Sequence, residues 1–354
     1  MHGRRRVKST AEAERARREK EAVKIQEYRQ LVENCFRMEI GCCPQRSNHE
    51  YTQNAFEITT KILWQNPDFY TIWNFRRNIL IHGLLKDAPE DQRQGLLSEE
   101  LVFLQEIFQS NPKSYWIFNH RRWCLETMPI PDWKKELYLV EKMLELDARN
   151  FHGWDYRRYV KSKLVNSMQP KELLQTDLDF TKKKLEQNFS NYSAWHQRSK
   201  LLPHLLSDAS EDERKRLIDE EFGIAKSAIY TDPDDQSAWL YYWWLLGREP
   251  HHTSVRDDSI HEESSMALAT VKGDRSTILA GEIEELKELL EEESNSKWCL
   301  QTLMHFYQEL KYAKKLDDSE LYNLDNEMEE ICVRLIKIDS MRARRYEDIR
   351  NNLN

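Results

Sequence analysis

The sequence predicts an all-α protein, an α-α superhelix of about seven helical hairpins. The main observation is a motif that recurs five times, in which an Asn or Asp is followed about seven residues later by an aromatic residue. These aromatic anchors are 45, 36, 41 and 44 residues apart, a period typical of stacked hairpins. No segment alternates between apolar and polar residues, and only 9 of 354 residues are glycine, so no strands are expected. The anchors are Trp73, Phe118, Trp154, Trp195 and Trp239.

The motif is predicted to begin the second helix of each hairpin. Its clearest copies cover residues 66–77, 111–122 and 147–158, and weaker copies cover 188–198 and 232–243. The Asn or Asp should cap the free amides at the helix start. Proline follows it in the first two copies and suits the first helical position, which needs no N–H group.

The first helix of each hairpin is expected directly before the motif. Within residues 53–65, the apolar positions 55, 58, 62 and 63 form one stripe along a helix. The same periodicity predicts first helices in four further segments, at 99–110, 133–146, 171–187 and 213–230.

Two consecutive arginines follow the anchor in the clearest copies. They lie three and four residues after it, and therefore on the same side of the helix. We expect salt bridges between repeats and hydrogen bonds to the preceding turn, with contacts to a partner protein as the alternative. The pairs are Arg76–Arg77, Arg121–Arg122 and Arg157–Arg158.

Four segments are expected along the chain. Residues 1–48 form a basic N-terminal segment and a first helix, and residues 49–246 hold five repeats. Residues 247–277 are rich in His, Asp, Glu and Ser and poor in large apolar residues, which is typical of a flexible loop. Residues 278–354 regain a helical pattern and are expected to form degenerate repeats, as is common at the end of a solenoid.

Composition excludes several classes of function. The net charge of −8 argues against nucleic-acid binding as the main role. No apolar run approaches the length of a membrane span. The basic N-terminus is followed by no apolar segment and the six cysteines show no C-x-x-C pairing, so we expect a cytoplasmic protein with reduced thiols.

The repeated pattern Asn-Pro-x-x-Tyr-x-x-Trp-x-x-Arg-Arg resembles the repeat of protein prenyltransferase α subunits. This resemblance implies a right-handed crescent solenoid. Only about thirty residues occupy the position of an immunoglobulin-like insert. The chain therefore resembles the compact form that lacks this insert and a leucine-rich domain, or a shortened version of a longer chain. The strings most similar to the Rab geranylgeranyltransferase (type II) α subunit are residues 1–4, 66–69, 150–158, 188–196 and 232–239.

The resemblance implies one subunit of an obligate heterodimer. The prenyltransferase β subunit is expected to hold the zinc and the lipid pocket. The pair would transfer geranylgeranyl from geranylgeranyl diphosphate to C-terminal cysteines of a Rab GTPase presented by a Rab escort protein. The alternatives are the α subunit shared by farnesyltransferase and type I geranylgeranyltransferase, or a non-catalytic helical-repeat scaffold.

The resemblance also assigns candidate site residues. Lys113 is expected to face the diphosphate as a catalytic residue, with Tyr115 as its neighbour in the site. A lysine in the first turn of a helix would add its charge to the positive end of the helix dipole. The alternative is an ordinary solvated lysine. Trp116 replaces the glutamine that reads a terminal carboxylate in the farnesyl enzyme, which puts strict tetrapeptide recognition in doubt.

A second group of candidates comes from the third repeat. Asn150, Phe151 and His152 match family positions that face substrate or diphosphate. The alternative for His152 is a histidine at a helix end that bonds the backbone. His2, near the N-terminus, is a candidate autoinhibitory ligand for the open zinc position of the partner, and no metal site is expected within this chain.

Overall fold

The computed structural model describes residues 10–40, 51–165, 168–246, 275–313 and 317–353. The chain forms two compact units. The first unit comprises residues 1–146 and 150–164, and the second comprises residues 147–149 and 165–354. All regular secondary structure within the described ranges is helical, as the sequence predicted.

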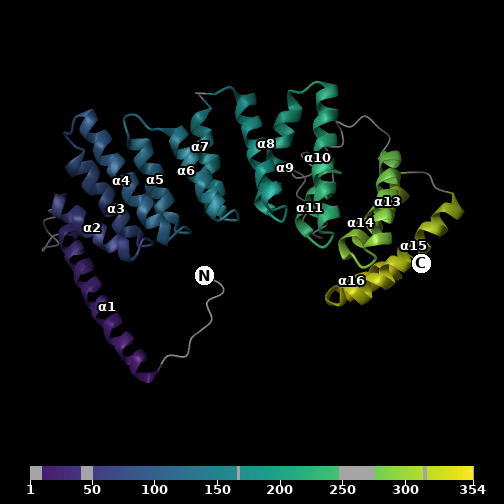
Figure 1. Ribbon diagram of the computed structural model, residues 1–354, viewed down its shortest axis with the longest axis horizontal. Helices are drawn as coiled ribbons and strands as arrows, with labels where there is room; N and C mark the ends of the chain where they lie inside the picture. The colour runs from purple at the N-terminus through teal and green to yellow at the C-terminus, as the bar shows by residue number, and fades with distance from the viewer. Residues whose placement is uncertain (1–9, 41–50, 166–167, 247–274, 314–316, 354) are drawn as a thin grey trace. The chain divides into compact units, whose positions relative to one another are not determined.

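The first unit is a series of hairpins that follows the long helix α1 (Figure 1). Helix α2 packs on α3, α4 on α5 and α6 on α7, so each hairpin joins neighbours in the sequence. Its elements are α1 (Ala11–Ile40), α2 (Gln53–Gln65), α3 (Tyr70–Ile79), the π-helix η1 (Leu80–Leu84), α4 (Glu90–Ser110), α5 (Tyr115–Thr127), α6 (Trp133–Leu146) and α7 (Phe151–Leu164).

The second unit repeats this arrangement in four hairpins, α8/α9, α10/α11, α13/α14 and α15/α16. Together with the three of the first unit, the described residues hold seven hairpins, the predicted number. Helix α13 begins within the last three residues of the expected loop. The elements are α8 (Pro170–Gln187), α9 (Tyr192–Ser207), α10 (Glu211–Thr231), α11 (Gln236–Leu245), α13 (Arg275–Glu292), α14 (Lys297–Ala313), α15 (Asp318–Ile338), the 3-10 turn η2 (Ser340–Arg342) and α16 (Ala343–Asn351).

The second helices begin three residues later than the sequence predicted. The motif Asn or Asp does not cap the helix; in four of the five copies its side-chain oxygen instead accepts the N–H group two residues on. Asn66 accepts from Asp68 at 3.2 Å and Asn188 from Ser190 at 3.0 Å. Asn and Asp favour this local turn, and a residue before proline avoids helical geometry. Helix α3 therefore begins at Tyr70.

The anchor tryptophans are both core residues and hydrogen-bond donors. Trp73 and Trp239 are fully buried. The indole N–H of Trp73 donates to the carbonyl of Pro67 at 2.8 Å, which closes the turn before the helix. The Ser114 hydroxyl, from the next repeat, donates to the Asp68 carboxylate at 2.6 Å, and its oxygen lies 3.4 Å from the same carbonyl. The turn is thus bonded both to its own helix and to the neighbouring hairpin.

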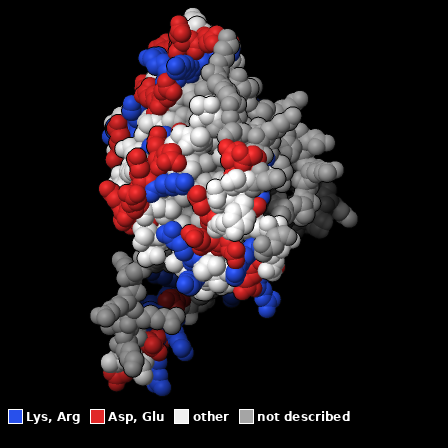
Figure 2. Space-filling model, turned by 90° about the vertical axis from the view of Figure 1, so that its right-hand side faces the viewer, with Lys and Arg blue, Asp and Glu red and all other residues white. Residues whose placement is uncertain are grey.

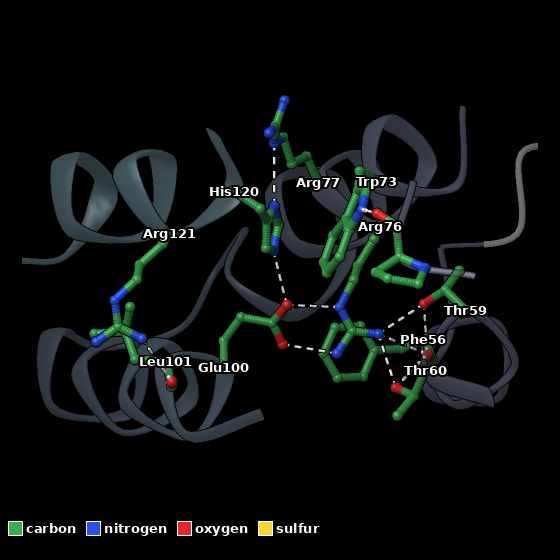
Figure 3. Close-up of polar contacts among 11 residues, drawn as sticks. Phe56, Thr59, Thr60, Trp73, Arg76, Arg77, Glu100, Leu101, His120 and Arg121 are labelled. Carbon is green, nitrogen blue, oxygen red and sulfur yellow. Dashed lines mark hydrogen bonds and ion pairs between the residues drawn. The ribbon is translucent and has the colours of Figure 1, made fainter. Parts of the chain in front are cut away.

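The first arginine of each pair is buried against a carboxylate. Arg76 contacts Glu100 of the next hairpin through two N···O distances of 2.6 and 2.7 Å, and it also donates to the Phe56 carbonyl at 3.0 Å (Figure 3). Arg121 pairs with Glu136 in the same way. Two paired charges with further hydrogen bonds can be accommodated in a core. These two contacts confirm the predicted salt bridges between repeats, whereas Arg157 pairs with Glu141 of its own hairpin.

Candidate functional site

Helices α5 and α7 bring the predicted site residues together at their N-terminal ends. Lys113 and Tyr115 lie at the start of α5, and Phe151 and His152 form the first turn of α7. Lys113 is exposed, and Tyr115 and Phe151 are 62% and 60% exposed. Because α5 begins at Tyr115, Lys113 precedes the helix and does not lie in its first turn, which corrects the prediction.

Asn150 holds the two turns in register. Its side-chain amide donates to the Pro112 carbonyl at 2.8 Å, one residue before Lys113. Its side-chain oxygen accepts the backbone N–H of His152 at 3.1 Å and that of Gly153 at 3.4 Å. Asn150 is only 4% exposed. Its amide therefore ties the turn that carries Lys113 to the turn that carries His152.

The His152 ring lies in an aromatic pocket. Its centroid is 4.1 Å from that of Tyr115, in an edge arrangement, and 6.1 Å from that of Phe118, in a stacked arrangement. Burial lowers the pKa of His152; Asp155 opposes this effect and the Lys113 charge adds to it. A lowered pKa keeps the ring neutral near pH 7, so the site holds one cation, Lys113, beside a neutral imidazole.

The position of Lys113 favours an anion at this site. A helix N-terminus carries partial positive charge, so a lysine there is not stabilised by the helix dipole. The ammonium group and the amides of the first turn of α5 instead reinforce one another towards a negatively charged group. The neighbouring Tyr115 presents an exposed phenol on the same turn.

Phe118 belongs to this site, although the sequence analysis did not include it there. It is the only one of the five anchors that is not a tryptophan. Phenylalanine has no N–H group, and the Pro112 carbonyl takes the Asn150 amide. The ring of Phe118 also stacks on His152. In the sequence, the sign of this role was a phenylalanine at an anchor position that is tryptophan in the other four copies.

Further predictions concern His2, metal binding and a membrane span. His2 lies outside the described residues. Over the part that is described, no three His, Cys, Asp or Glu side chains are arranged to hold a metal ion. None of the helices searched there is long and apolar enough to cross a membrane. Acidic and basic side chains are interspersed on the face shown in Figure 2, where no continuous basic surface is visible.

Comparison with known proteins identifies the family. A family model described as the protein prenyltransferase alpha subunit repeat matches residues 52–83, 97–128, 133–160, 174–205 and 218–249. The geranylgeranyl transferase type-2 subunit alpha of Schizosaccharomyces pombe is 34% identical over 361 residues, which cover 100% of this chain and 99% of the relative. The chain belongs to the family of protein prenyltransferase α subunits.

Mammalian relatives are longer than this chain. The geranylgeranyl transferase type-2 subunit alpha of Rattus norvegicus is 41% identical over 273 residues, which cover 76% of this chain and 46% of the relative. The chain spans about half the length of the mammalian relatives it matches. A chain of the solved Candida albicans protein geranylgeranyltransferase-I complexed with GGPP has the same fold, with a TM-score of 0.63, 23% identity, and coverage of 93% of this chain and 91% of that one.

Proposed function

We propose that this chain is the α subunit of a cytoplasmic protein geranylgeranyltransferase of type 2. With a prenyltransferase β subunit, it transfers geranylgeranyl from its diphosphate to C-terminal cysteines of Rab GTPases presented by an escort protein. The names of the relatives support the reaction class. The observation that carries the proposal is the cation Lys113, set at the start of α5 beside Tyr115 and His152.

The site is suited to the leaving group of this reaction. When the bond between the isoprenoid carbon and the diphosphate oxygen breaks, negative charge grows on the diphosphate as the cysteine sulfur attacks the carbon. Lys113 and the first-turn amides of α5 stabilise that charge. Tyr115 and the neutral ring of His152 contribute further polar groups, and the Phe151 ring lies beside both. A zinc ion held by the β subunit would lower the pKa of the substrate cysteine, so that its sulfur attacks as a thiolate.

An exposed aromatic edge supports the β subunit as the partner. Tyr70, Tyr115 and Phe151 begin α3, α5 and α7, and each is more than half exposed. Exposed aromatic residues in a row mark surfaces that another protein covers. The β subunit would bring its lipid pocket to this edge, and His2 would reach its zinc in the absence of substrate.

Lys113→Ala in the heterodimer tests the proposal. We expect turnover to fall about 100-fold or more, because one charged group that stabilises the leaving diphosphate is lost. Yield and zinc content of the heterodimer should not change, since Lys113 is exposed. The matched control is Lys134→Ala, which removes an exposed lysine at the start of α6, outside the site. Equal turnover of the two variants would remove Lys113 from the mechanism.

A further inference from the structure

Arg77 differs from the second arginines of the other two clear repeats in its partner, a histidine. Arg158 pairs with Asp155, and Arg122 lies 3.8 Å from the centre of the Tyr159 ring. Arg77 is partly buried, and its Nε–H donates to Nδ1 of His120 at 3.1 Å. Across the described ranges of the chain, no carboxylate pairs with Arg77.

The polar cluster around Arg77 carries one uncompensated positive charge. Nδ1 of His120 accepts from Arg77, so the ring proton is on Nε2, which lies 2.7 Å from Glu100. His120 is therefore neutral, and burial lowers its pKa to about 4. Glu100 and Arg76 neutralise each other. In Figure 3 Arg77 lies on the opposite side of His120 from Glu100, so the Glu100 carboxylate does not reach its guanidinium.

The Nη groups of Arg77 are available to bind a ligand. His120 takes the Nε–H, and within the described structure the two Nη groups have no acceptor. The indole of Trp123 lies 6.0 Å from the guanidinium carbon and stacks on the His120 ring at 5.2 Å. An apolar flank strengthens charge interactions. A planar edge with two free N–H groups matches a carboxylate, which it can bind through two parallel hydrogen bonds.

We propose that Arg77 binds a carboxylate side chain of the β subunit and anchors the heterodimer. This inference rests on the proposed function. Arg77 follows Tyr70 by seven residues, so it lies on the same face of α3, about 10 Å along the helix. That face already presents the exposed Tyr70 ring. The diphosphate-facing groups lie instead on α5 and α7, and buried arginines at the centre of interfaces often dominate binding energy.

The test measures the heterodimer dissociation constant and the melting temperature of the 354-residue chain. We expect Arg77→Gln to weaken binding to the β subunit at least ten-fold and to reduce its dependence on salt. The dissociation constant of Arg77→Lys should lie between those of the wild-type chain and Arg77→Gln, because lysine keeps the charge but lacks the planar edge. The melting temperature of the Arg77→Gln chain should stay equal or rise, because an unpaired, partly buried charge is removed. Lys134→Gln, which removes an exposed cation on α6 outside this face, is the control and should leave binding unchanged.

Four other results would contradict the role of Arg77 as an anchor of the heterodimer, each for a different reason. Unchanged binding of Arg77→Gln excludes the anchor. A lower melting temperature with proportionally weaker binding shows a structural role. Unchanged binding with a raised KM for geranylgeranyl diphosphate assigns the guanidinium to the substrate. Failure of the wild-type chain to bind any prenyltransferase β subunit removes the proposed function, and this anchor with it.

Discussion

At the scale of single residues, the buried His120 links stability to pH. It is fully buried between Arg77 and Glu100, and burial lowers its pKa from 6.5 to about 4. Burial alone would raise the pKa of Glu100, but Arg76 and His120 lower it to about 2. Protonation of either group therefore favours the unfolded chain. The His120 contribution is complete above the unfolded pKa of 6.5 and is lost as pH falls towards 4.

We therefore predict that the free energy of unfolding falls by on the order of 2–3 kcal/mol between pH 7 and pH 4 through His120 alone. Urea denaturation at a series of pH values measures it. His120→Gln is the control, because a glutamine amide can accept from Arg77 and donate to Glu100 without titrating. An equally steep pH dependence in His120→Gln between 6.5 and 4 would show that His120 is not responsible.

Some functional and structural residues could be predicted from the sequence, and others could not. The family pattern located Lys113, Tyr115 and His152, and the structure brings these residues together. The pattern did not reveal Glu100, because it lies 24 residues from Arg76 and reads as an ordinary acidic residue on a helix. Its burial depends on how two hairpins pack, which local sequence does not encode.

At the scale of elements, Asn150 sets the relation between the starts of α5 and α7. We predict that Asn150→Asp lowers turnover of the heterodimer at least ten-fold. A carboxylate cannot donate to the Pro112 carbonyl, so the turns that carry Lys113 and His152 separate. Asn150→Ser should retain more activity, because a hydroxyl can donate to the Pro112 carbonyl whereas a carboxylate cannot.

Steady-state kinetics of the two variants checks this prediction. The control is Asn191→Asp in the next repeat, where Asn191 donates to Ala148 at 3.1 Å. Asn191→Asp should destabilise the chain by a similar amount, about 1–3 kcal/mol, without the specific loss of turnover. If both Asp variants lose turnover equally, Asn150 has only a structural role.

Replacing either of two helical glycines by alanine should change the stability of the chain, in opposite directions. A Cβ atom at Gly83, in the π-helix η1, would collide with the backbone oxygen of Tyr51. Gly83→Ala should therefore destabilise the chain by about 1–3 kcal/mol or more. A Cβ atom at Gly95 meets nothing within 4 Å, so Gly95→Ala should stabilise α4 by about 0.5–1 kcal/mol. Thermal melting distinguishes them, and a stabilising Gly83→Ala would contradict the close approach of Tyr51.

At the scale of the whole molecule, the repeat architecture was predictable because each hairpin packs mainly on its sequence neighbours. The period and the apolar stripes report such local contacts directly. The starts of the second helices were placed three residues early, because the same Asn-Pro pair suits both a helix cap and a local turn. Contacts between repeats favour the local turn, as in the hydrogen bond from Ser114 to Asp68 of the preceding repeat.

The exposed aromatic edge leads to a prediction for the assembled enzyme. The first-turn amides of a helix have no partner within the helix, so they exchange hydrogen rapidly unless something covers them. The proposed interface covers the starts of α3, α5 and α7, where Tyr70, Tyr115 and Phe151 are exposed. Binding of the β subunit should slow hydrogen exchange at the starts of α3 and α5 and leave the starts of α4 and α6 unchanged. In α7 the N–H groups of His152 and Gly153 already donate to the Asn150 side chain, so the change there should be smaller. Mass spectrometry of the chain alone and in the heterodimer measures both sets, and protection confined to α4 and α6 would place the partner on the first helices instead.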